Sequence, residues 1–452
     1  MIRTLKRTAS VFFMLAVVLA LPAQDTDSEP SLSMPAPLVY EEHQLSNGLS
    51  VITHEDHSAP VVNAQLWYHV GSKNEVEGRS GFAHLFEHLM FQGSENVAPE
   101  EHSALINGVG GVMNAYTSDD VTVYWETVPS NYLERVLWLE ADRMRSLDVS
   151  EENFSSEREV VKEERRVRVE SPPYGDLFET LYASAFDVHP YSHTPIGSME
   201  DLDNATIADV RDFWEIYYAP SNAYLVLAGD FDTEQAMTWI EEYFGSIPSG
   251  QAPVPRVTVR EPAHDAERRV AREKAVPLAA YVAGYYVPED GHPDSYPLVI
   301  ASSILAEGRS SRVYTSLVYE SQLALQADSG ASFREHPNLF FAFLIMNQGA
   351  SIEDGEARLN AEFQRMMEEP VTEEELEKAR NQMRASYIMG RQSVQDKAGA
   401  LGHAAVIHQD TASANDELEL FLNVSAEDIM RVTRQYLNPE NRTVLTVVPP
   451  GE

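Results

Sequence analysis

The sequence predicts an α+β fold built from two similar halves, and three observations support this prediction. Segments rich in β-branched and aromatic residues, such as 61–70, alternate with segments of helical periodicity, such as 81–91. The pattern Tyr-x-x-Pro-x-Asn, followed by a strand-like run, begins at Tyr217 and recurs at Tyr436. A Pro-rich stretch, 247–255, separates the two copies. So short a pattern can also recur by chance, and the repeat alone does not establish a duplication.

Composition and charge narrow the class of protein. The chain has 452 residues, of which 43% are hydrophobic and 23% charged, as in globular proteins of two or three domains. It has no cysteine, which excludes disulfides, thiolate metal sites and a cysteine nucleophile. Any metal must therefore be bound by nitrogen and oxygen atoms. The formal net charge of −38 makes nucleic acid a poor partner.

The first residues have the features of a secretory signal peptide. Basic residues precede the apolar run 11–21, and small residues follow it up to Ala23. We therefore expect residues 1–23 to be a signal peptide and the mature protein to be periplasmic or secreted, with no membrane span after cleavage. The alternative is an uncleaved membrane anchor, although the run is shorter than the roughly 18 apolar residues that a membrane helix needs.

The rest of the chain divides at the Pro-rich stretch. Residues 24–39 are polar, contain Pro and Ser, and are expected to be a mobile lead-in. The N-terminal half then spans 40–246. A linker spans 247–262, and a C-terminal half without metal ligands spans 263–452.

The segment His84-Leu-Phe-Glu87-His88 is the strongest indication of chemistry. On a helix, His84 and His88 lie on one face because they are about one turn apart, and Glu87 lies within the same arc. Two imidazoles at this spacing can bind one zinc ion, with the carboxylate beside the open coordination position. Every other residue from 82 to 91 is apolar, so these three polar groups need partners. The alternative is a pair of histidines that fall four residues apart without binding a metal.

A second helix-like segment, 151–169, offers a third ligand. Glu157 and Glu164 are two turns apart and share a face, and Glu164 is expected in the middle of an apolar stripe. The stripe is formed by Val160, Val161 and Val167. A carboxylate in that position needs a cation or strong hydrogen-bond donors. Arginine from a neighbouring element is the alternative partner for both glutamates.

Together the two segments supply the ligand set of a catalytic zinc site. Two histidines and one glutamate are expected to bind the ion, with water in the fourth position. Glu87 is placed to take a proton from that water as it attacks a peptide carbonyl, and to give the proton later to the leaving amine. Glu157 is placed to hydrogen-bond a ligand from outside the coordination sphere.

These motifs resemble those of the pitrilysin family of inverted zinc metallopeptidases, which includes insulin-degrading enzyme and the processing peptidase of mitochondria. The matching stretches run through most of the predicted mature chain. They are Gly71–Glu75, Gly81–His88, Asn114–Thr117, Glu157–Glu164, His189–Tyr191, Pro220–Asn222 and Gly229–Asp230. The resemblance implies that His84, His88 and Glu164 are zinc ligands and that Glu87 is the general base.

The resemblance also implies an architecture and a mode of substrate binding. Family members of this length consist of two homologous α/β halves, each a mostly antiparallel sheet packed with helices. Two such chains pack face to face and enclose a peptide, which pairs with an edge strand. Here that strand is expected around 113–117, with Asn114 and Ala115 contacting the substrate. The alternative role for Asn114 is that of a turn residue after the preceding glycines.

The C-terminal half departs from the family pattern at two places. It has no His-x-x-Glu-His, since Ser302 and Ser303 occupy the positions of the base and the second histidine, so we expect one zinc ion per chain. In relatives that act alone, this half supplies an Arg and a Tyr that help hold the scissile carbonyl.

The positions that match this Arg and Tyr are Val318 and Leu325, which cannot donate a side-chain hydrogen bond to an oxyanion. A shifted register would instead supply Arg312 and Tyr319. The unshifted register, which we favour, predicts a heterodimer in which a sister chain supplies the Arg and Tyr. A homodimer is the alternative.

The sequence therefore predicts a zinc metalloendopeptidase that hydrolyses unfolded peptides inside a closed chamber. The alternative is a non-catalytic structural or assembly subunit of the same fold. Other histidines carry weaker signals. His189 and His193 are expected to be loop residues, because Pro190 between them disfavours a helical metal pair. His54 and His57 are expected to be solvated.

Overall fold

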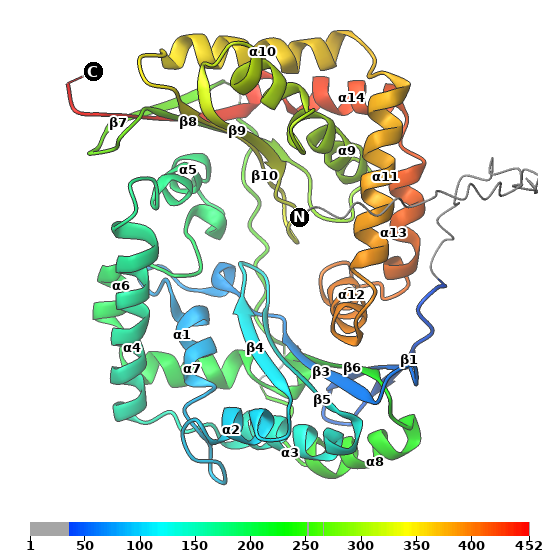
Figure 1. Cartoon of the computed structure of the whole chain (residues 1–452). Helices are drawn as coiled ribbons and strands as arrows, with labels where there is room; N and C mark the ends of the chain where they lie inside the picture. The colour runs from blue at the N-terminus through cyan, green and yellow to red at the C-terminus, as the bar shows by residue number, and fades with distance from the viewer. Residues whose placement is uncertain (1–35, 251–252, 265, 452) are drawn as a thin grey trace, which may run out of the picture. The chain divides into compact units, whose positions relative to one another are not determined.

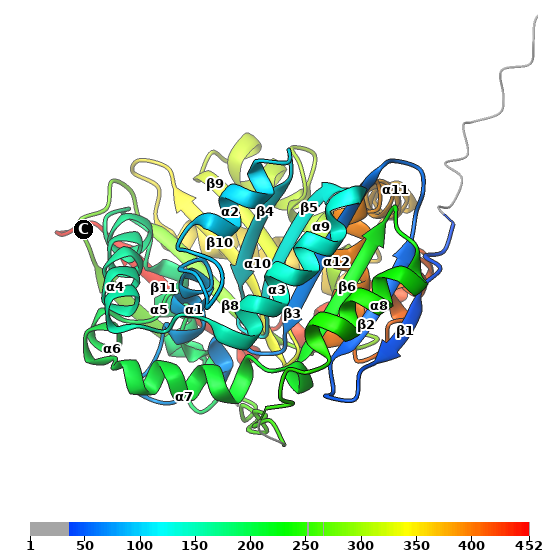
Figure 2. The ribbon, with the colours of Figure 1, turned by 90° about the horizontal axis from the view of Figure 1, so that it is seen from below.

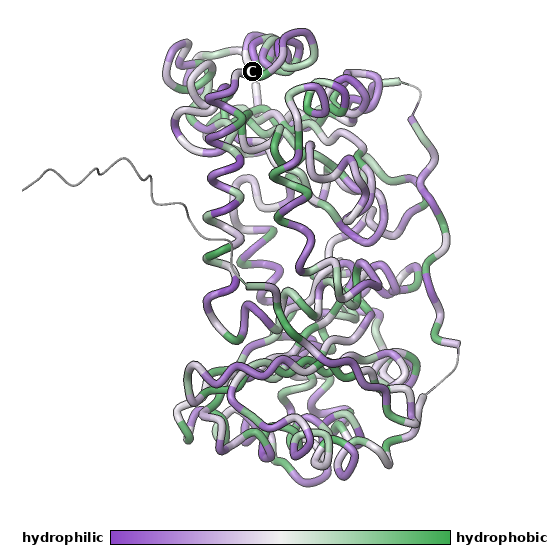
Figure 3. The backbone as a smooth tube through the Cα atoms, turned by 90° about the vertical axis from the view of Figure 1, so that its right-hand side faces the viewer, coloured by the Kyte–Doolittle hydropathy of each residue, from purple (hydrophilic) through white to green (hydrophobic). Residues whose placement is uncertain are grey.

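The computed structural model of the chain describes residues 36–250, 253–264 and 266–451. The predicted signal peptide and residues 24–35 of the predicted lead-in lie outside these residues. Within the described part of the chain, no helix has the length and apolar character needed to cross a membrane. Figure 3 shows hydrophilic and hydrophobic residues interspersed along the helices.

The N-terminal half is built on a sheet of six described strands (Figures 1 and 2). The strands are β1 (Glu41–Gln44), β2 (Ser50–Glu55), β3 (Val61–Tyr68), β4 (Val112–Thr117), β5 (Thr122–Pro129) and β6 (Ala223–Gly229). They lie in the order β1-β2-β6-β3-β5-β4. β2 and β6 are parallel, whereas the other neighbouring pairs are antiparallel. β4 is therefore an edge strand, as the sequence predicts for 113–117.

The C-terminal half repeats this arrangement. Its strands are β7 (Arg268–Glu273), β8 (Ala280–Val287), β9 (Ala324–Ala331), β10 (Asn338–Met346) and β11 (Arg442–Val448). They lie in the order β7-β11-β8-β10-β9, with β7 and β11 parallel and the other pairs antiparallel. Apart from β1, the order and directions equal those of the first sheet. The predicted α+β class with two similar, mostly antiparallel halves is confirmed.

The N-terminal half contributes eight of the described helices, and all of them except α5 share a core with the first sheet. The eight helices are α1 (Phe82–Leu89), α2 (Glu101–Asn107), α3 (Leu133–Ser146), α4 (Glu151–Arg165), α5 (Leu177–Ala185), α6 (Met199–Asn204), α7 (Ile207–Tyr217) and α8 (Thr233–Phe244). Phe86 of α1, Val136 of α3 and Ile240 of α8 share one core with Leu66 and Leu225 of the sheet. This core fixes α1 against the sheet and so determines where its polar face points.

The C-terminal half has a second core of the same kind. Its helices are α9 (Ser295–Ala306), α10 (Ile352–Glu368), α11 (Glu373–Met389), α12 (Val394–Val406), α13 (Ser413–Leu422) and α14 (Ala426–Tyr436). Leu298 of α9, Leu359 of α10 and Val432 of α14 pack against Tyr285 and Val444 of the second sheet.

The two halves exchange one helix each, and Figure 1 shows both exchanged helices between the two sheets. α12 packs on the first sheet, where Leu401 lies in one cluster with Trp67. A Cβ at Gly402 would lie 2.4 Å from the Trp67 ring, so this approach requires glycine. Reciprocally, α5 packs on the second sheet, where Leu181 joins Leu445. Each sheet therefore buries apolar surface against a helix from the other half.

The repeated sequence pattern performs the same structural task in both halves. Asn222 donates hydrogen bonds from Nδ2 to the carbonyls of His69 (3.3 Å) and Tyr217 (2.8 Å). Asn441 donates in the same way to the carbonyls of Tyr286 and Tyr436, both at 2.8 Å. Each asparagine thus joins a helix end to the neighbouring strand of its sheet.

Asn222→Ala is expected to destabilise the protein by about 2–4 kcal/mol, because two carbonyls lose their donor in a buried place. Asn441→Ala serves as the matched control. It should lower stability less, by about 1 kcal/mol, because its partly exposed position admits water to the freed carbonyls. Urea unfolding of both variants measures the difference, and equal losses would contradict this assignment.

A loop of the C-terminal half inserts a charged side chain into the N-terminal half. Glu335, between β9 and β10, forms ion pairs with Lys73 and with His69, whose Nε2 lies 2.6 Å away. Its backbone N–H also donates to Asp120 at 3.1 Å. Burial raises the pKa of Glu335, but the hydrogen bond from His69 and the charges of His69 and Lys73 outweigh it and lower the pKa to about 2.

A carboxylate with a lowered pKa stabilises the folded state above its unfolded pKa, and this contribution is lost as the pH falls towards the folded value. Glu335→Gln is therefore expected to lower stability by about 3 kcal/mol at neutral pH. The difference from the wild type should shrink as the pH falls from about 4.5 towards 2. Glu320→Gln is the control. Glu320 is exposed and forms an ion pair with Arg358, so its replacement should change stability little. If Glu335→Gln lost the same amount of stability at every pH, the lowered pKa of Glu335 would not be the cause.

Candidate metal centre

α1 places three of the predicted residues on one face. Its buried residues are Phe82, Ala83, Leu85, Phe86 and Leu89. His84, Glu87 and His88 lie on the opposite face and are partly buried. The imidazole rings of the two histidines are 4.9 Å apart between centroids and nearly perpendicular, at 85°. Two imidazoles and a carboxylate therefore point away from the core into one region, as the spacing predicts.

The start of α1 is fixed by a buried carboxylate. Glu75 accepts hydrogen bonds from the backbone N–H groups of Gly81 (2.9 Å) and Ala83 (2.8 Å), which have no partner within the helix. His193 lies 2.9 Å from the same carboxylate. Burial lowers the pKa of His193, but the hydrogen bond and charge of Glu75 outweigh it, and the pKa is raised. This pair holds the helix that carries the candidate ligands.

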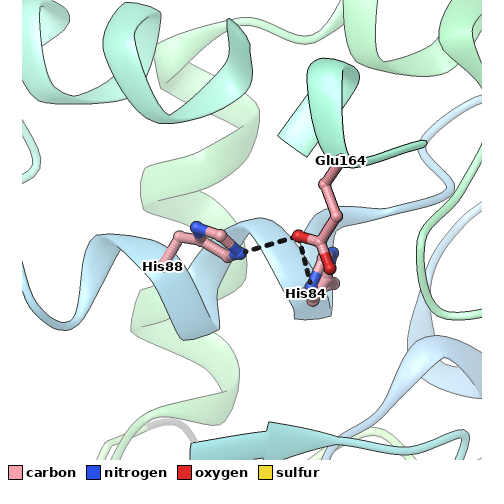
Figure 4. Close-up of side chains that lie close together, drawn as sticks. All are labelled: His84, His88 and Glu164. Atoms are coloured by element: carbon pink, nitrogen blue, oxygen red, sulfur yellow. Dashed lines mark ion pairs between the residues drawn. The ribbon is translucent and has the colours of Figure 1, made fainter. Parts of the chain in front are cut away.

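Glu164 of α4 completes a cluster with the two histidines (Figure 4). Its Oε2 lies 3.6 Å from Nε2 of His84 and 3.4 Å from Nε2 of His88. Two atoms bound to one tetrahedral zinc ion at about 2.0–2.1 Å lie about 3.4 Å apart. The donor set and its spacing therefore fit a zinc ion. Nδ1 of His84 is buried and has no hydrogen-bond partner among the described residues.

Glu157 lies behind the cluster, seven residues before Glu164 on the same helix. Its Oε2 is 3.2 Å from Nδ1 of His88, and its Oε1 accepts a hydrogen bond of 2.9 Å from Gln92. The contact with Nδ1 leaves Nε2 of His88 to face Glu164. A carboxylate in this position orients a ligand histidine and increases its basicity.

Glu87 connects the cluster with the edge strand. Its Oε2 accepts a hydrogen bond of 2.7 Å from Oγ1 of Thr117, the last residue of β4. Along β4, Asn114 is exposed and Ala115 is buried. A cavity of about 330 Å³ opens beside the cluster; its lining includes His84, Thr117, Glu164, Arg168, Phe178 and Ile196. The candidate base therefore lies between the edge strand and the candidate ligands.

The surroundings of the cluster shift the pKa values of all three of its side chains on α1. Burial and the neighbouring His88 lower the pKa of His84 to about 4, so its imidazole is neutral near pH 7 and keeps a lone pair. Burial lowers the pKa of His88, but the hydrogen bond and charge of Glu157 outweigh it and raise the pKa. Burial also raises the pKa of Glu87, and it outweighs the hydrogen bond from Thr117, which lowers that pKa. A carboxylate with a raised pKa is a stronger base.

The helix that carries Glu164 differs from its prediction in two ways. The α-helix ends at Arg165, and residues Arg166–Glu170 form a π-helical turn, whereas the pattern predicts one helix over 151–169. Val161 is buried as expected, but Val160 and Val167 are exposed, so the predicted apolar stripe is wrong. Glu164 is held by polar neighbours instead of lying within apolar surface.

Glu164 contacts an arginine as well as the two histidines, but this arginine comes from the turn that continues its own helix and not from a neighbouring element. Arg168 forms an ion pair with its Oε1 at 2.5 Å, while Oε2 faces the histidines. Sequence reasoning missed the roles of Arg168, Thr117 and Glu75. The four-residue spacing between Glu164 and Arg168 was an available signal. The contacts of Thr117 and Glu75 depend on the way that strands and loops meet α1.

The other histidines only partly follow the predictions. His189 begins a 3₁₀ turn, Pro190–Ser192, and is not part of a metal pair with His193, but it is buried and lies 2.8 Å from His336 of the C-terminal half. His57 is solvated, as predicted. His54 is buried and contacts the carbonyl of Val39 at 2.7 Å, so its predicted exposure is wrong.

The C-terminal half carries serines where the first half carries the base and a histidine. Ser303 of α9 donates a hydrogen bond of 2.6 Å to Glu307. Arg312 is buried and pairs with both carboxylate oxygens of Glu375, at 2.7 and 2.8 Å. Leu325, on β9, is exposed. The arginine of the shifted register is therefore already paired within its own half.

Comparisons with known proteins agree with this fold and identify the family. Residues 50–198 match the family described as Insulinase (Peptidase family M16), and residues 204–383 match the Peptidase M16 inactive domain. The chain is 32% identical to zinc protease PqqE of Helicobacter pylori over 413 residues, which cover 91% of this chain and 93% of that protein.

Two solved structures extend the comparison. The crystal structure of a protease from Helicobacter pylori is 32% identical, has a TM-score of 0.88, and matches over 92% of this chain and 100% of its own. The periplasmic protease PqqL from Escherichia coli shares the fold, with a TM-score of 0.73 and 18% identity over 91% of this chain but only 48% of its own. The resemblance predicted from the motifs is confirmed. The chain belongs to the insulinase family, peptidase family M16.

Proposed function

We propose that this chain is the zinc-binding, catalytic subunit of a dimeric metalloendopeptidase that hydrolyses unfolded peptides in a closed chamber. The observation that carries the proposal is the cluster of His84, His88 and Glu164, with Glu87 beside it on the same helix. The name of the Helicobacter pylori relative, zinc protease, supports the choice of metal and reaction.

We assign the three clustered side chains to one catalytic zinc ion per chain. A zinc ion bound there supplies Lewis acidity, which makes water acidic enough to lose a proton near neutral pH and polarises a peptide carbonyl. Glu87 accepts that proton and later donates it to the leaving amine. Thr117 holds Oε2 of Glu87, so Oε1 is the atom placed to exchange the proton. Glu157 keeps the ring of His88 oriented.

We propose that the substrate pairs with β4. This strand lies at the sheet edge, and its last residue, Thr117, contacts the candidate base. A peptide added there in extended form would bond mainly through its backbone, which gives affinity with little selection by sequence. Asn114, exposed on the strand, and Ala115 are the residues assigned to substrate contact. Only an unfolded segment can present the free backbone that this mode requires.

We propose that a second chain completes the chamber. Val318 and Leu325 stand where self-sufficient relatives have an Arg and a Tyr, which favours a sister subunit that supplies these two residues. The ion pair of Arg312 with Glu375 supports the unshifted register. The match to only 48% of PqqL supports a two-unit arrangement, because that chain has room for two units of this size. The predicted signal peptide favours the periplasm or the exterior as the location.

The test compares two preparations of the protein. Material purified from its native source should contain a second chain and cleave an unstructured peptide in a zinc-dependent way, leaving a folded protein intact. The recombinant chain alone should bind zinc but cleave more slowly. Full activity of the isolated chain would contradict the heterodimer. A zinc-loaded native preparation that cleaves no unstructured peptide would favour the alternative, a non-catalytic assembly subunit.

Glu157→Ala is expected to weaken zinc binding by about 10- to 100-fold, because His88 loses the carboxylate that orients its ring. The dissociation constant is measured by competition with a chelator of known affinity. Glu159→Ala is the matched control, since Glu159 lies on the same helix, is exposed and pairs only with neighbouring cations. Equal zinc affinity in both variants would show that Glu157 does not orient the site.

A further inference from the structure

A second group of metal-binding side chains lies far along the chain from the first. Asp290, in the loop between β8 and α9, approaches His403 in the last turn of α12 and His408 just beyond it. Nε2 of His403 lies 2.9 Å from Oδ2 of Asp290, and Nε2 of His408 lies 3.4 Å from Oδ1. One ligand atom from each residue lies within 4.8 Å of the other two.

The hydrogen bonds around His408 determine which ring nitrogen is free. Oγ of Ser413 donates its single proton to the carbonyl of Asp410, at 2.7 Å. The same oxygen lies 2.9 Å from Nδ1 of His408, so it must accept there, and Nδ1 carries the proton. In the neutral imidazole, Nε2 then has a lone pair that faces the carboxylate of Asp290.

A lone pair opposite a carboxylate is unfavourable unless a proton or a metal ion lies between them. Nε2 of His408 is buried and makes no hydrogen bond among the described residues. A metal ion bound to Nε2 removes this conflict. An imidazole whose other N–H donates to an oxygen is also the usual arrangement of a metal-binding histidine. The local hydrogen bonding therefore prepares His408 to be a ligand.

The loop of Asp290 is shaped to approach the histidine. Gly291 has a φ of 75°, and a Cβ there would lie 3.3 Å from Cδ2 of His408. The backbone N–H of Asp290 donates to the carbonyl of Arg334 at 2.8 Å, which fixes the loop from its other side. The side chains of His403, Asp290 and His408 are 47%, 22% and 12% exposed, so water can reach the remaining coordination positions.

We propose that Asp290, His403 and His408 bind a divalent transition-metal ion such as Zn²⁺, as a second site separate from the catalytic cluster. Two imidazole nitrogens and one carboxylate oxygen favour zinc, cobalt, nickel or copper over magnesium and calcium, which take oxygen ligands. Nε2 of His408 and Oδ1 of Asp290 are 3.4 Å apart, as are two ligands of one tetrahedral ion at about 3.4 Å, whereas Nε2 of His403 lies closer, at 2.9 Å from the other oxygen, Oδ2.

The place of this site in the fold gives it a structural role. α12 packs on the first sheet, whereas Asp290 follows a strand of the second sheet. An ion at this site ties the exchanged helix to the C-terminal half. It is therefore expected to raise the melting temperature, because it binds the folded state and not the unfolded chain.

The test is a metal titration of the untagged chain after removal of metal with a chelator. Co²⁺ binding is followed by its visible absorption, and Zn²⁺ binding by calorimetry. The chain should bind two equivalents, the second more weakly. Asp290→Asn, His403→Ala and His408→Ala should each lose the weaker equivalent and its increase in melting temperature, while the tighter one remains.

His57→Ala is the matched control, because His57 is an exposed histidine that pairs with a carboxylate, at 2.7 Å from Asp230, without a second imidazole. It should keep both equivalents. Glu164→Ala should lose only the tighter one, so failure of the catalytic site is distinguishable from failure of this one. The proposal is overturned if none of the three variants loses an equivalent, which would leave Asp290 and the histidines as an ion pair.

Discussion

Replacing Glu87 by glutamine is expected to reduce peptide hydrolysis by about 10²–10⁴-fold while zinc stays bound. Glutamine has nearly the size of glutamate and can still interact with Oγ1 of Thr117, but it cannot accept the proton from water. The three candidate ligands are not touched by the change. Turnover of an unstructured peptide and zinc content, measured on the same preparation, give the two readouts.

The control for this variant is Thr117→Val, which keeps the carboxylate and removes its hydrogen bond of 2.7 Å. Activity should fall far less than in Glu87→Gln, because the base is still present and only its orientation is loosened. If Glu87→Gln keeps activity within tenfold of the wild type, another group accepts the proton and the assignment of the base is wrong.

Replacing Glu164 by alanine is expected to abolish stoichiometric zinc binding and, with it, hydrolysis. The change leaves two imidazoles without the carboxylate oxygen that faces both of them at 3.6 and 3.4 Å. Two neutral ligands bind zinc far more weakly than the three-ligand set of a catalytic site. The measurement is zinc content after dialysis against a weak chelator, together with the peptidase assay.

Glu163→Ala is the matched control for this second variant. Glu163 precedes Glu164 on the same helix, is exposed and pairs with Arg166 at 3.0 Å. It should keep both zinc and activity, since a surface pair of this kind contributes little to stability. Zinc retained in Glu164→Ala would mean that the third ligand lies elsewhere.

The sequence predicted those parts of the site that lie within one helix. His84, Glu87 and His88 follow from helical geometry, because the spacing along α1 determines which side chains share a face. Glu164 could be proposed because a ligand set was incomplete, but its surroundings could not. The exposed positions of Val160 and Val167 show that the pattern of valines did not report burial on α4.

Contacts between distant segments were beyond sequence reasoning. Nothing in the periodicity of α5 and α12 shows that each helix packs on the sheet of the other half, since an amphipathic face specifies burial but not its partner. The burial of His189 against His336 depends on the same arrangement. The hydrogen bond from Thr117 to Glu87 likewise exists only because β4 ends beside α1. The repeated asparagines, in contrast, correctly indicated two similar halves, because the hydrogen bonds of each asparagine lie within its own half.

A crystal structure of the zinc-loaded chain, with anomalous diffraction data collected at the zinc absorption edge, shows directly whether the three side chains bind the ion. We expect a strong anomalous peak within about 2.0–2.2 Å of Nε2 of His84, Nε2 of His88 and a carboxylate oxygen of Glu164. A chain that holds stoichiometric zinc but shows no peak among these three side chains would contradict the assignment of the ligands.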